Sequence, residues 1–169
     1  MHLIIDGYNL LHTNRSLNQL NGIQLQWERD HLIHQLSTYQ KLKPFDITVV
    51  FDGWQGGWST EKRERKKGIE LIFSKLGEKA DEVIKRLVRE KGSGVIVITS
   101  DREVSRFAER MAVSVISSEQ FQEKLEAPSN KSEDIFEEEE EEEKGIKKKG
   151  LSRRLSKKEK RKNAALKKL

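Results

Sequence analysis

Three short apolar runs in this chain each lead directly toward an aspartate. They are residues 3–5 before Asp6, residues 47–51 before Asp52, and residues 95–98 before Thr99, Ser100 and Asp101. Apolar runs of this length, bounded by turn-forming residues, are typical of buried β-strands. In open α/β sheets, ligands bind in the crevice beyond the carboxyl ends of the strands. A parallel sheet built from these runs would therefore gather three carboxylates at one edge.

Helical periodicity separates these strands. Apolar residues at helical spacing predict helices over 27–42, 80–90, 102–111 and 118–125, and further strands are predicted over 69–73 and 113–116. Strands that alternate with helices predict an α/β fold, a three-layer Rossmann-like parallel sheet flanked by helices on both faces. Residues 54–68, which include a glycine pair and a basic run, are expected to form a loop.

Asp6 permits two interpretations. Gly7 allows a sharp turn after the strand, and Asn9 offers an amide that could hold the Asp6 carboxylate or contact a substrate. An aspartate in this position also commonly caps the following helix or closes a turn. The recurrence of the pattern at Asp52 and Asp101 favours a functional role over a purely structural one.

A fourth carboxylate, Asp81, falls in the first turn of the predicted helix over 80–90. Its charge would interact favourably with the helix N-terminus, which is a sufficient structural reason for an acid there. Apolar neighbours would also bury this turn against the sheet edge, within reach of Asp6 and Asp101. Several aspartates in one crevice are costly unless a cation compensates them, and all-oxygen ligands suit Mg²⁺ or Mn²⁺. Such sites support attack of an activated water on a phosphodiester.

Four blocks of the sequence resemble a known family. They are Ile4-Ile5-Asp6-Gly7-Tyr8-Asn9-Leu10, Val49-Val50-Phe51-Asp52-Gly53, Ala80-Asp81-Glu82-Val83-Ile84 and Val97-Ile98-Thr99-Ser100-Asp101. In this order they resemble the NYN domain, a branch of the PIN-like nucleases, and most of all its bacterial YacP-like members. The resemblance covers residues 1–125. It implies a metal-dependent endoribonuclease on a Rossmann-like sheet, and the YacP-like group is associated with mRNA cleavage on the translating ribosome.

The resemblance also implies roles for individual residues by motif position. Asp6, Asp81 and Asp101 would hold the metal, Asp52 would lie close to it, and Asn9 and Ser100 would be orienting groups. One position departs from the family pattern, because Glu82 stands where many members carry a second aspartate. We do not count Glu82 as a ligand.

The predicted loop carries most of the candidate RNA contacts. Trp54 and Trp58 flank the glycine pair, and the basic residues that follow are Lys62, Arg63, Arg65, Lys66 and Lys67. Aromatic rings beside cations suit stacking on the bases of single-stranded RNA and contact with its backbone. The alternative is a hydrophobic plug beneath a solvated, charged loop. Ser100 and Arg102, on either side of Asp101, are further candidate RNA contacts.

The charges are unevenly distributed along the chain. Residues 1–126 carry 19 basic and 18 acidic groups, whereas residues 127–169 carry 14 and 10. Residues 137–143 are seven consecutive glutamates, and residues 144–169 hold 13 basic residues and a single acidic one. Such blocks repel themselves and build no core. We therefore expect a nuclease domain over 1–126, an acidic linker over 127–143 and a disordered basic tail over 144–169.

Composition bears on location as well. The chain has no cysteine, which fits a reducing cytosol. It contains no apolar run near the roughly 18 residues that would indicate a membrane span. Its first residues lack the basic and apolar regions of a secretory signal. We expect a cytoplasmic protein without a membrane partner.

Two classes of function remain open at this stage. The first is a metal-dependent endoribonuclease that cuts RNA, with mRNA as substrate and the ribosome as partner. The second is a non-catalytic RNA- or ribosome-binding module on the same fold. The four aspartates favour the enzyme, because an acidic crevice would hinder simple binding to phosphates.

Overall fold

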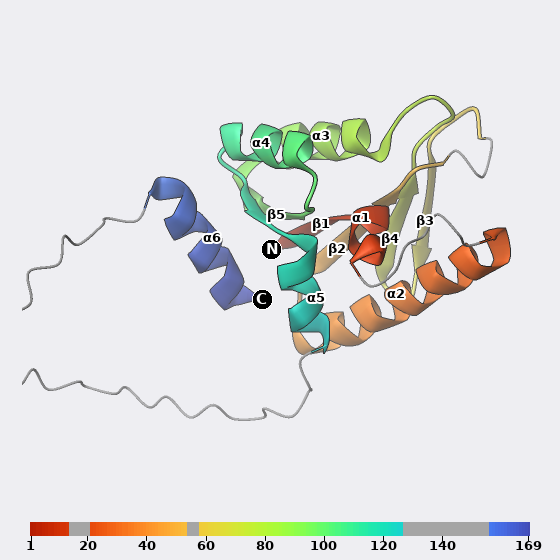
Figure 1. Cartoon of the computed structure of the whole chain (residues 1–169), viewed down its shortest axis with the longest axis horizontal. Helices are drawn as coiled ribbons and strands as arrows, with labels where there is room; N and C mark the ends of the chain where they lie inside the picture. Colours follow the sequence, from red (N-terminus) through yellow and green to blue (C-terminus); the bar gives the residue numbers. More distant parts are fainter. Residues whose placement is uncertain (14–20, 54–57, 127–155) are drawn as a thin grey trace, which may run out of the picture.

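A six-stranded sheet forms the centre of the molecule (Figure 1). The structure is a computed structural model, and it describes residues 1–13, 21–53, 58–126 and 156–169. The strands are β1 (His2–Asp6), β2 (Asp46–Phe51), β3 (Lys62–Lys66), β4 (Ile69–Phe73), β5 (Val95–Ile98) and β6 (Ser114–Ile116). Their order across the sheet is β3-β4-β2-β1-β5-β6, and only β3 runs antiparallel to its neighbour. The predicted α/β class with a mainly parallel sheet is confirmed.

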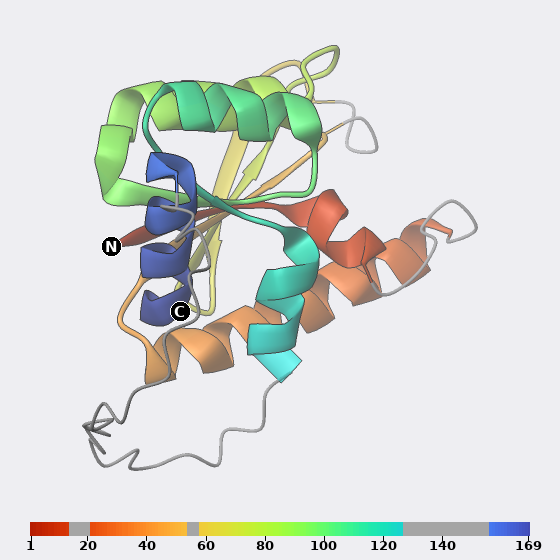
Figure 2. The same cartoon turned by 60° about the vertical axis from the view of Figure 1, so that its left-hand side comes forward.

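Helices cover both faces of this sheet, as Figures 1 and 2 show. They are α1 (Gly7–His12), α2 (Gly22–Leu42), α3 (Ala80–Lys91), α4 (Arg102–Arg110), α5 (Ser118–Glu126) and α6 (Lys157–Lys168), with a short 3₁₀ turn, η2 (Gly92–Gly94), before β5. One apolar core lies between the sheet and the side chains of α1, α2, α5 and α6. A second core lies between the sheet and the pair α3 and α4. Buried side chains therefore point from the central strands into both layers.

The central strands bring the aspartates to one edge, as the apolar runs predict. β1 pairs in parallel with β2 on one side and with β5 on the other, so Ile5 lies opposite both Val49 and Ile98. All three strands therefore end at the same level of the sheet. Asp6 closes β1, Asp52 directly follows β2, and Asp101 lies three residues beyond β5.

Helix boundaries follow local capping. α2 begins at Gly22 rather than near Trp27, because Asn21 and Gln24 exchange side-chain and main-chain hydrogen bonds in a capping box. The short helix α1 was not predicted as a helix. Asp6 caps it by accepting a hydrogen bond from the Asn9 amide. The alternative interpretation of Asp6 as a cap is therefore correct as a description of its local structure.

The predicted loop over 54–68 is wrong in its second half. Lys62–Lys66 forms the edge strand β3, which pairs with β4 through a two-residue turn at Lys67 and Gly68. Both turn residues have positive φ, 52° and 86°, as a type I′ hairpin requires. The basic run is therefore held on an edge strand, where charged side chains also discourage pairing with another chain.

The expectation of a disordered tail over 144–169 needs correction at its end. Lys157–Lys168 forms helix α6, and Ser156 caps it in a box with Glu159. Ala165 and Leu169 are buried in the core beside α2 and α5, and Tyr39 Oη donates a hydrogen bond to the Leu169 main-chain oxygen at 2.8 Å. The acidic linker over 127–143 lies outside the described residues. None of the described helices is long and apolar enough to cross a membrane.

Candidate active site

Asp6 is the most enclosed of the four candidate acids. It is 6% exposed, and each of its carboxylate oxygens accepts one hydrogen bond at a distance of 3.1 Å. Oδ1 accepts from the Asn9 amide and Oδ2 from the Thr99 hydroxyl. Burial raises the pKa of Asp6 to about 6, and the negative charges of Asp81 and Asp52 contribute to this rise. The raised pKa means that the ionised form of this carboxylate is poorly stabilised, and a neighbouring cation would stabilise it.

Asp101 and Asp52 accept main-chain hydrogen bonds at the starts of α4 and α3, the two helices that cover one face of the sheet. Asp101 Oδ1 accepts hydrogen bonds from the amides of Glu103 and Val104, each at 2.8 Å, which begins α4. Asp52 Oδ1 accepts from the amide of Ala80 at 2.6 Å and so attaches the first turn of α3 to the end of β2. This contact places Asp81, the next residue, at the acidic edge.

Asp81 shares an electrostatic neighbourhood with the other acids. Its pKa is raised by burial and by the charges of Asp101 and Asp52, and Lys85 acts in the opposite direction. The charges of Asp81 and Asp52 in turn raise the pKa of Asp6. The four aspartates therefore share one electrostatic neighbourhood at this edge of the sheet. Within the described residues, however, no three histidine, cysteine, aspartate or glutamate side chains are arranged so that they could hold one metal ion.

Asn9 and Ser100 form the frame around the acids. Asn9 Oδ1 accepts hydrogen bonds from the Ser100 amide and from the Ser118 hydroxyl, both at 2.8 Å. Ser100 Oγ donates to Glu119 and accepts from the Ser118 amide. These bonds join the start of α1, the loop after β5 and the start of α5. Asn9 thus orients the loop that carries Thr99 and Asp101, which is consistent with its assignment as an orienting group.

Two residues at this edge were missed from the sequence. Thr99 holds Asp6, and the signal was a hydroxyl immediately after an apolar strand. Lys85 is 7% exposed and lies one helical turn after Asp81. It donates to Glu82 at 2.8 Å and also bonds Glu103. Glu82 is therefore engaged by Lys85, in agreement with its exclusion from the ligand set.

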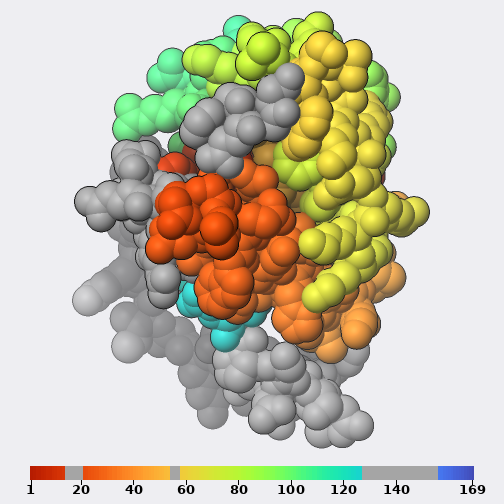
Figure 3. All heavy atoms as spheres, turned by 90° about the vertical axis from the view of Figure 1, so that its right-hand side faces the viewer, coloured from red at the N-terminus to blue at the C-terminus, as the bar shows by residue number. Residues whose placement is uncertain are grey.

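The basic run that was predicted to bind RNA lies on the edge strand β3 and the turn after it. Carboxylates pair with much of its charge. Lys62 bonds Glu64 at 3.1 Å, Arg63 bonds Glu61 at 2.7 Å, and Lys66 bonds Asp30 of α2 at 2.7 Å. Figure 3 shows the hairpin of β3 and β4 beside α2 on this face. The side chain of Arg65 contacts the main-chain oxygen of Gly68, and that of Lys67 contacts His34.

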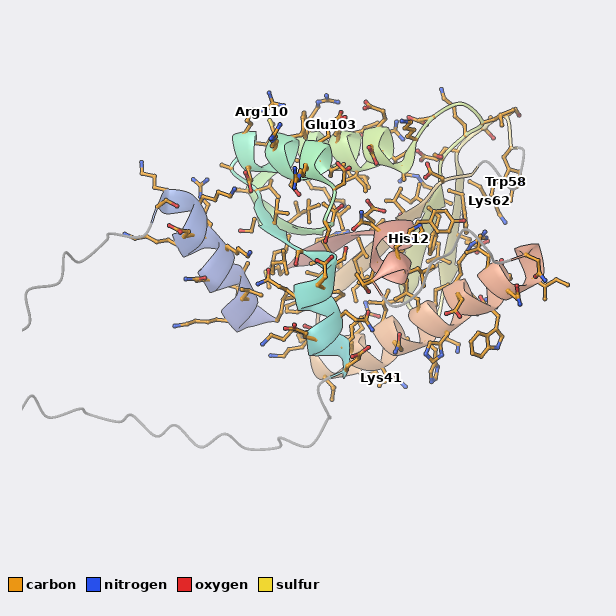
Figure 4. The ribbon with its side chains drawn as sticks, in the orientation of Figure 1. His12, Lys41, Trp58, Lys62, Glu103 and Arg110 are labelled. Carbon is orange, nitrogen blue, oxygen red and sulfur yellow. The ribbon has the colours of Figure 1, made fainter. Side chains whose placement is uncertain are left out.

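Trp58 fits the alternative of a hydrophobic plug. Its ring packs edge-on against Phe73 with centroids 5.3 Å apart, and Lys62 Nζ lies 4.7 Å from its centroid. Figure 4 shows Trp58 and Lys62 near β3, well separated from Glu103 and Arg110 on α4. Trp54 lies outside the described residues. Arg102 is exposed on α4 directly after Asp101 and shares a surface hollow with Arg106 and Arg110.

A mainly parallel sheet with aspartates from three neighbouring strands at its carboxyl edge is the arrangement of a PIN-like, nuclease-type domain. The family model of the YacP-like NYN domain matches residues 3–168 of this chain. The chain belongs to this YacP-like NYN family, whose PIN-like nuclease character indicates a nuclease-type, RNA-related function. The match extends beyond the expected boundary near residue 125 and includes all of α6.

Individual relatives agree with this assignment. The uncharacterized protein YacP of Bacillus subtilis (strain 168) is 33% identical over 87 residues, which are 52% of this chain and 51% of that protein. The aligned part thus spans about half the length of that relative. Two crystal structures of Rae1 (YacP) from Bacillus subtilis, one of them a tryptophan-to-leucine mutant, are 26% identical to this chain. The mutant has a TM-score of 0.61 with 74% of each chain covered, and the other has 0.59 with 75% of this chain and 74% of that one.

Proposed function

We propose that this protein is a metal-dependent endoribonuclease that hydrolyses phosphodiester bonds in RNA. The ion would be Mg²⁺ or Mn²⁺, held by Asp6, Asp81 and Asp101 with Asp52 beside them. One observation carries the proposal: the pKa values of Asp6 and Asp81 are both raised, first by burial and then by the negative charges of neighbouring aspartates, and the pKa of Asp6 is raised to about 6. Oxygen-only, anionic donors of this kind fit a hard divalent cation.

The chain's own residues would prepare the site. Thr99 and the Asn9 amide keep the Asp6 carboxylate fixed, and the Asp52–Ala80 contact keeps Asp81 at the same edge. Asn9 and Ser100 hold the loop before Asp101 in place. When bound, a divalent ion supplies an activated water and neutralises charge on a phosphodiester.

The finer proposal concerns the substrate. Family membership supports RNA, and we propose mRNA on the translating ribosome as its source. A ribosome-bound substrate would place the protein in the cytoplasm. Cations on β3, α4 and α6 are available for contact with RNA phosphates, although those of β3 are largely paired with carboxylates.

A binding module without catalysis is the second candidate, and one observation favours it. Asp6, Asp52 and Asp101 each accept main-chain hydrogen bonds at a helix start, so their presence has a structural explanation without any metal. The two candidates differ in whether RNA is cut.

A cleavage assay separates them. The full chain is incubated with a defined RNA, with and without ribosomes, in Mg²⁺, in Mn²⁺ and in EDTA. The enzyme hypothesis predicts new RNA ends in at least one metal and none in EDTA. RNA binding without cleavage in every condition would instead support the binding module.

A further inference from the structure

A cavity of about 330 Å³ lies between α6 and the edge strand β6. Its neutral lining includes the hydroxyl residues Ser114 and Ser117, and its basic lining consists of Lys158, Arg161 and Lys162 of α6. Figure 2 shows α6 standing beside this end of the sheet. The cavity therefore exists only because the C-terminal helix folds back on the domain.

The cavity adjoins the acidic edge through shared residues. Thr99 and Ser100 line it, and both are bonded directly to candidate active-site residues. The Thr99 hydroxyl donates to Asp6 at 3.1 Å, and the Ser100 amide donates to Asn9 at 2.8 Å. A strand of substrate that crosses the acidic edge could thus continue into the cavity without leaving the protein surface.

The charges in the cavity favour an anionic ligand. Lys158 is paired with Glu109 at 2.9 Å, and Glu119 accepts a hydrogen bond from the Ser100 hydroxyl. Glu119 keeps its negative charge, so the three basic residues of the lining exceed its two acidic residues by one charge. Arg161 and Lys162 have no carboxylate partner among the residues that the structure describes, in contrast to Lys62, Arg63 and Lys66 of β3. Cations that face a cavity and lack a carboxylate partner can each donate hydrogen bonds to a phosphate, and serine hydroxyls commonly donate to phosphate oxygens as well.

We propose that this cavity binds the phosphodiester backbone of single-stranded RNA on one side of the cleavage point. The inference rests on the proposed function for its substrate class. Arg161 and Lys162 contact the phosphates, and Ser114 and Ser117 provide neutral donors. The main basic contact of the RNA is thus on α6 rather than on the basic run of β3.

The test is RNA binding rather than cleavage. Anisotropy of a labelled single-stranded RNA is measured with the full chain in EDTA over a salt series, for wild type and for Arg161→Gln/Lys162→Gln. The matched control is Lys160→Gln/Lys167→Gln, which removes the same charge from exposed positions of the same helix outside the cavity. Loss of two phosphate contacts to single-stranded RNA should lower the slope of log K against log salt by about 1.4 and weaken binding roughly tenfold at moderate salt. The control should retain the wild-type slope.

Equal losses in the two variants would overturn the proposal, since they would indicate unspecific attraction to the helix. Unchanged binding in both would also overturn it. A charge-conserving variant, Arg161→Lys/Lys162→Arg, should keep the salt slope, and a loss of slope there would point to disturbed folding of α6. Because binding in EDTA needs no cleavage, a failure of the cavity proposal is distinguishable from a failure of the nuclease proposal.

Discussion

The Asp52 carboxylate accepts a hydrogen bond at 2.6 Å from the main-chain amide of Ala80, which lies 28 positions later in the sequence. The bond joins the end of β2 to the first turn of α3. It has a consequence for the site, because Asp81 follows Ala80 directly and its position depends on where α3 begins. A side chain that acts as an acid in the cluster therefore also fixes the position of another acid.

Substitution of Asp52 should separate these two roles. Asp52→Asn keeps an acceptor oxygen for the Ala80 amide, so the protein should remain folded. Asp52→Ala leaves that amide without its partner, which should cost about 1–3 kcal/mol of unfolding free energy. Urea unfolding of the two variants measures the difference. Equal stability of both variants would show that the bond does not hold α3.

Asp6→Asn should change the pH dependence of stability. In the folded protein the pKa of Asp6 is raised to about 6, whereas the ordinary pKa of an aspartate is 3.8. The folded wild type therefore binds more protons than the unfolded chain in this window, and its stability falls as the pH rises from about 4 to 6. Asparagine removes this loss while retaining the cap acceptor. In EDTA the variant should be more stable than wild type by up to about 3 kcal/mol near pH 8, and the difference should vanish near pH 3.

The comparison needs a variant with the same chemical change elsewhere. Asp46 is exposed at the opposite end of β2, so Asp46→Asn provides it. A stability difference for Asp6→Asn that stayed constant across the pH range would contradict a raised pKa as its cause.

Removal of α6 should weaken the domain. Truncation after residue 155 removes Leu169 from the core and takes away the acceptor of the Tyr39 hydroxyl. Burial of one leucine contributes about 2 kcal/mol, so the unfolding free energy should fall by at least this amount. Tyr39→Phe in the full chain should cost about 1 kcal/mol and speed amide exchange in α6 while leaving α3 unchanged. Wild-type stability of the truncated chain would show that α6 does not stabilise the domain.

Gly53→Ala should damage the acidic edge. A Cβ at this position would lie 1.8 Å from the Ser74 carbonyl oxygen, which is main chain and cannot move aside. The substitution should therefore displace Asp52 and lower both stability and any RNA cleavage. Gly94→Ala is the control, because a Cβ there meets nothing within 4 Å. Thermal unfolding and the cleavage assay together measure the effect, and equal behaviour of the two variants would argue against it.

The buried strands and the aspartates that follow them were predictable, because a continuous apolar run in the sequence indicates a buried strand. Val95–Ile98 and its neighbours are continuous apolar runs, which only a buried strand explains well. β3 was not predictable in this way, since all five of its side chains are charged and its conformation depends on pairing with β4. Lys67-Gly68 before the run of β4 was a usable turn signal.

The tail shows a different limit. The composition of α6 is strongly basic, so composition alone predicted disorder. Its capping box at Ser156 and Glu159 was a local signal for a helix. Its attachment to Tyr39 and Glu109 depends on residues distant in the sequence, and no local pattern could predict it. The Asp52–Ala80 and Thr99–Asp6 contacts are of the same kind.

The rate of RNA cleavage tests most directly whether the acidic edge is an active site. A defined RNA is incubated with the full chain in Mn²⁺, for wild type, Asp6→Asn/Asp81→Asn and the control Asp46→Asn. Loss of two proposed ligands should reduce the rate by roughly 100-fold or more, because a catalytic ion contributes several kcal/mol to the transition state. Asp46→Asn should cut at the wild-type rate. A double variant that cut RNA as fast as the wild type would contradict the assignment of Asp6 and Asp81.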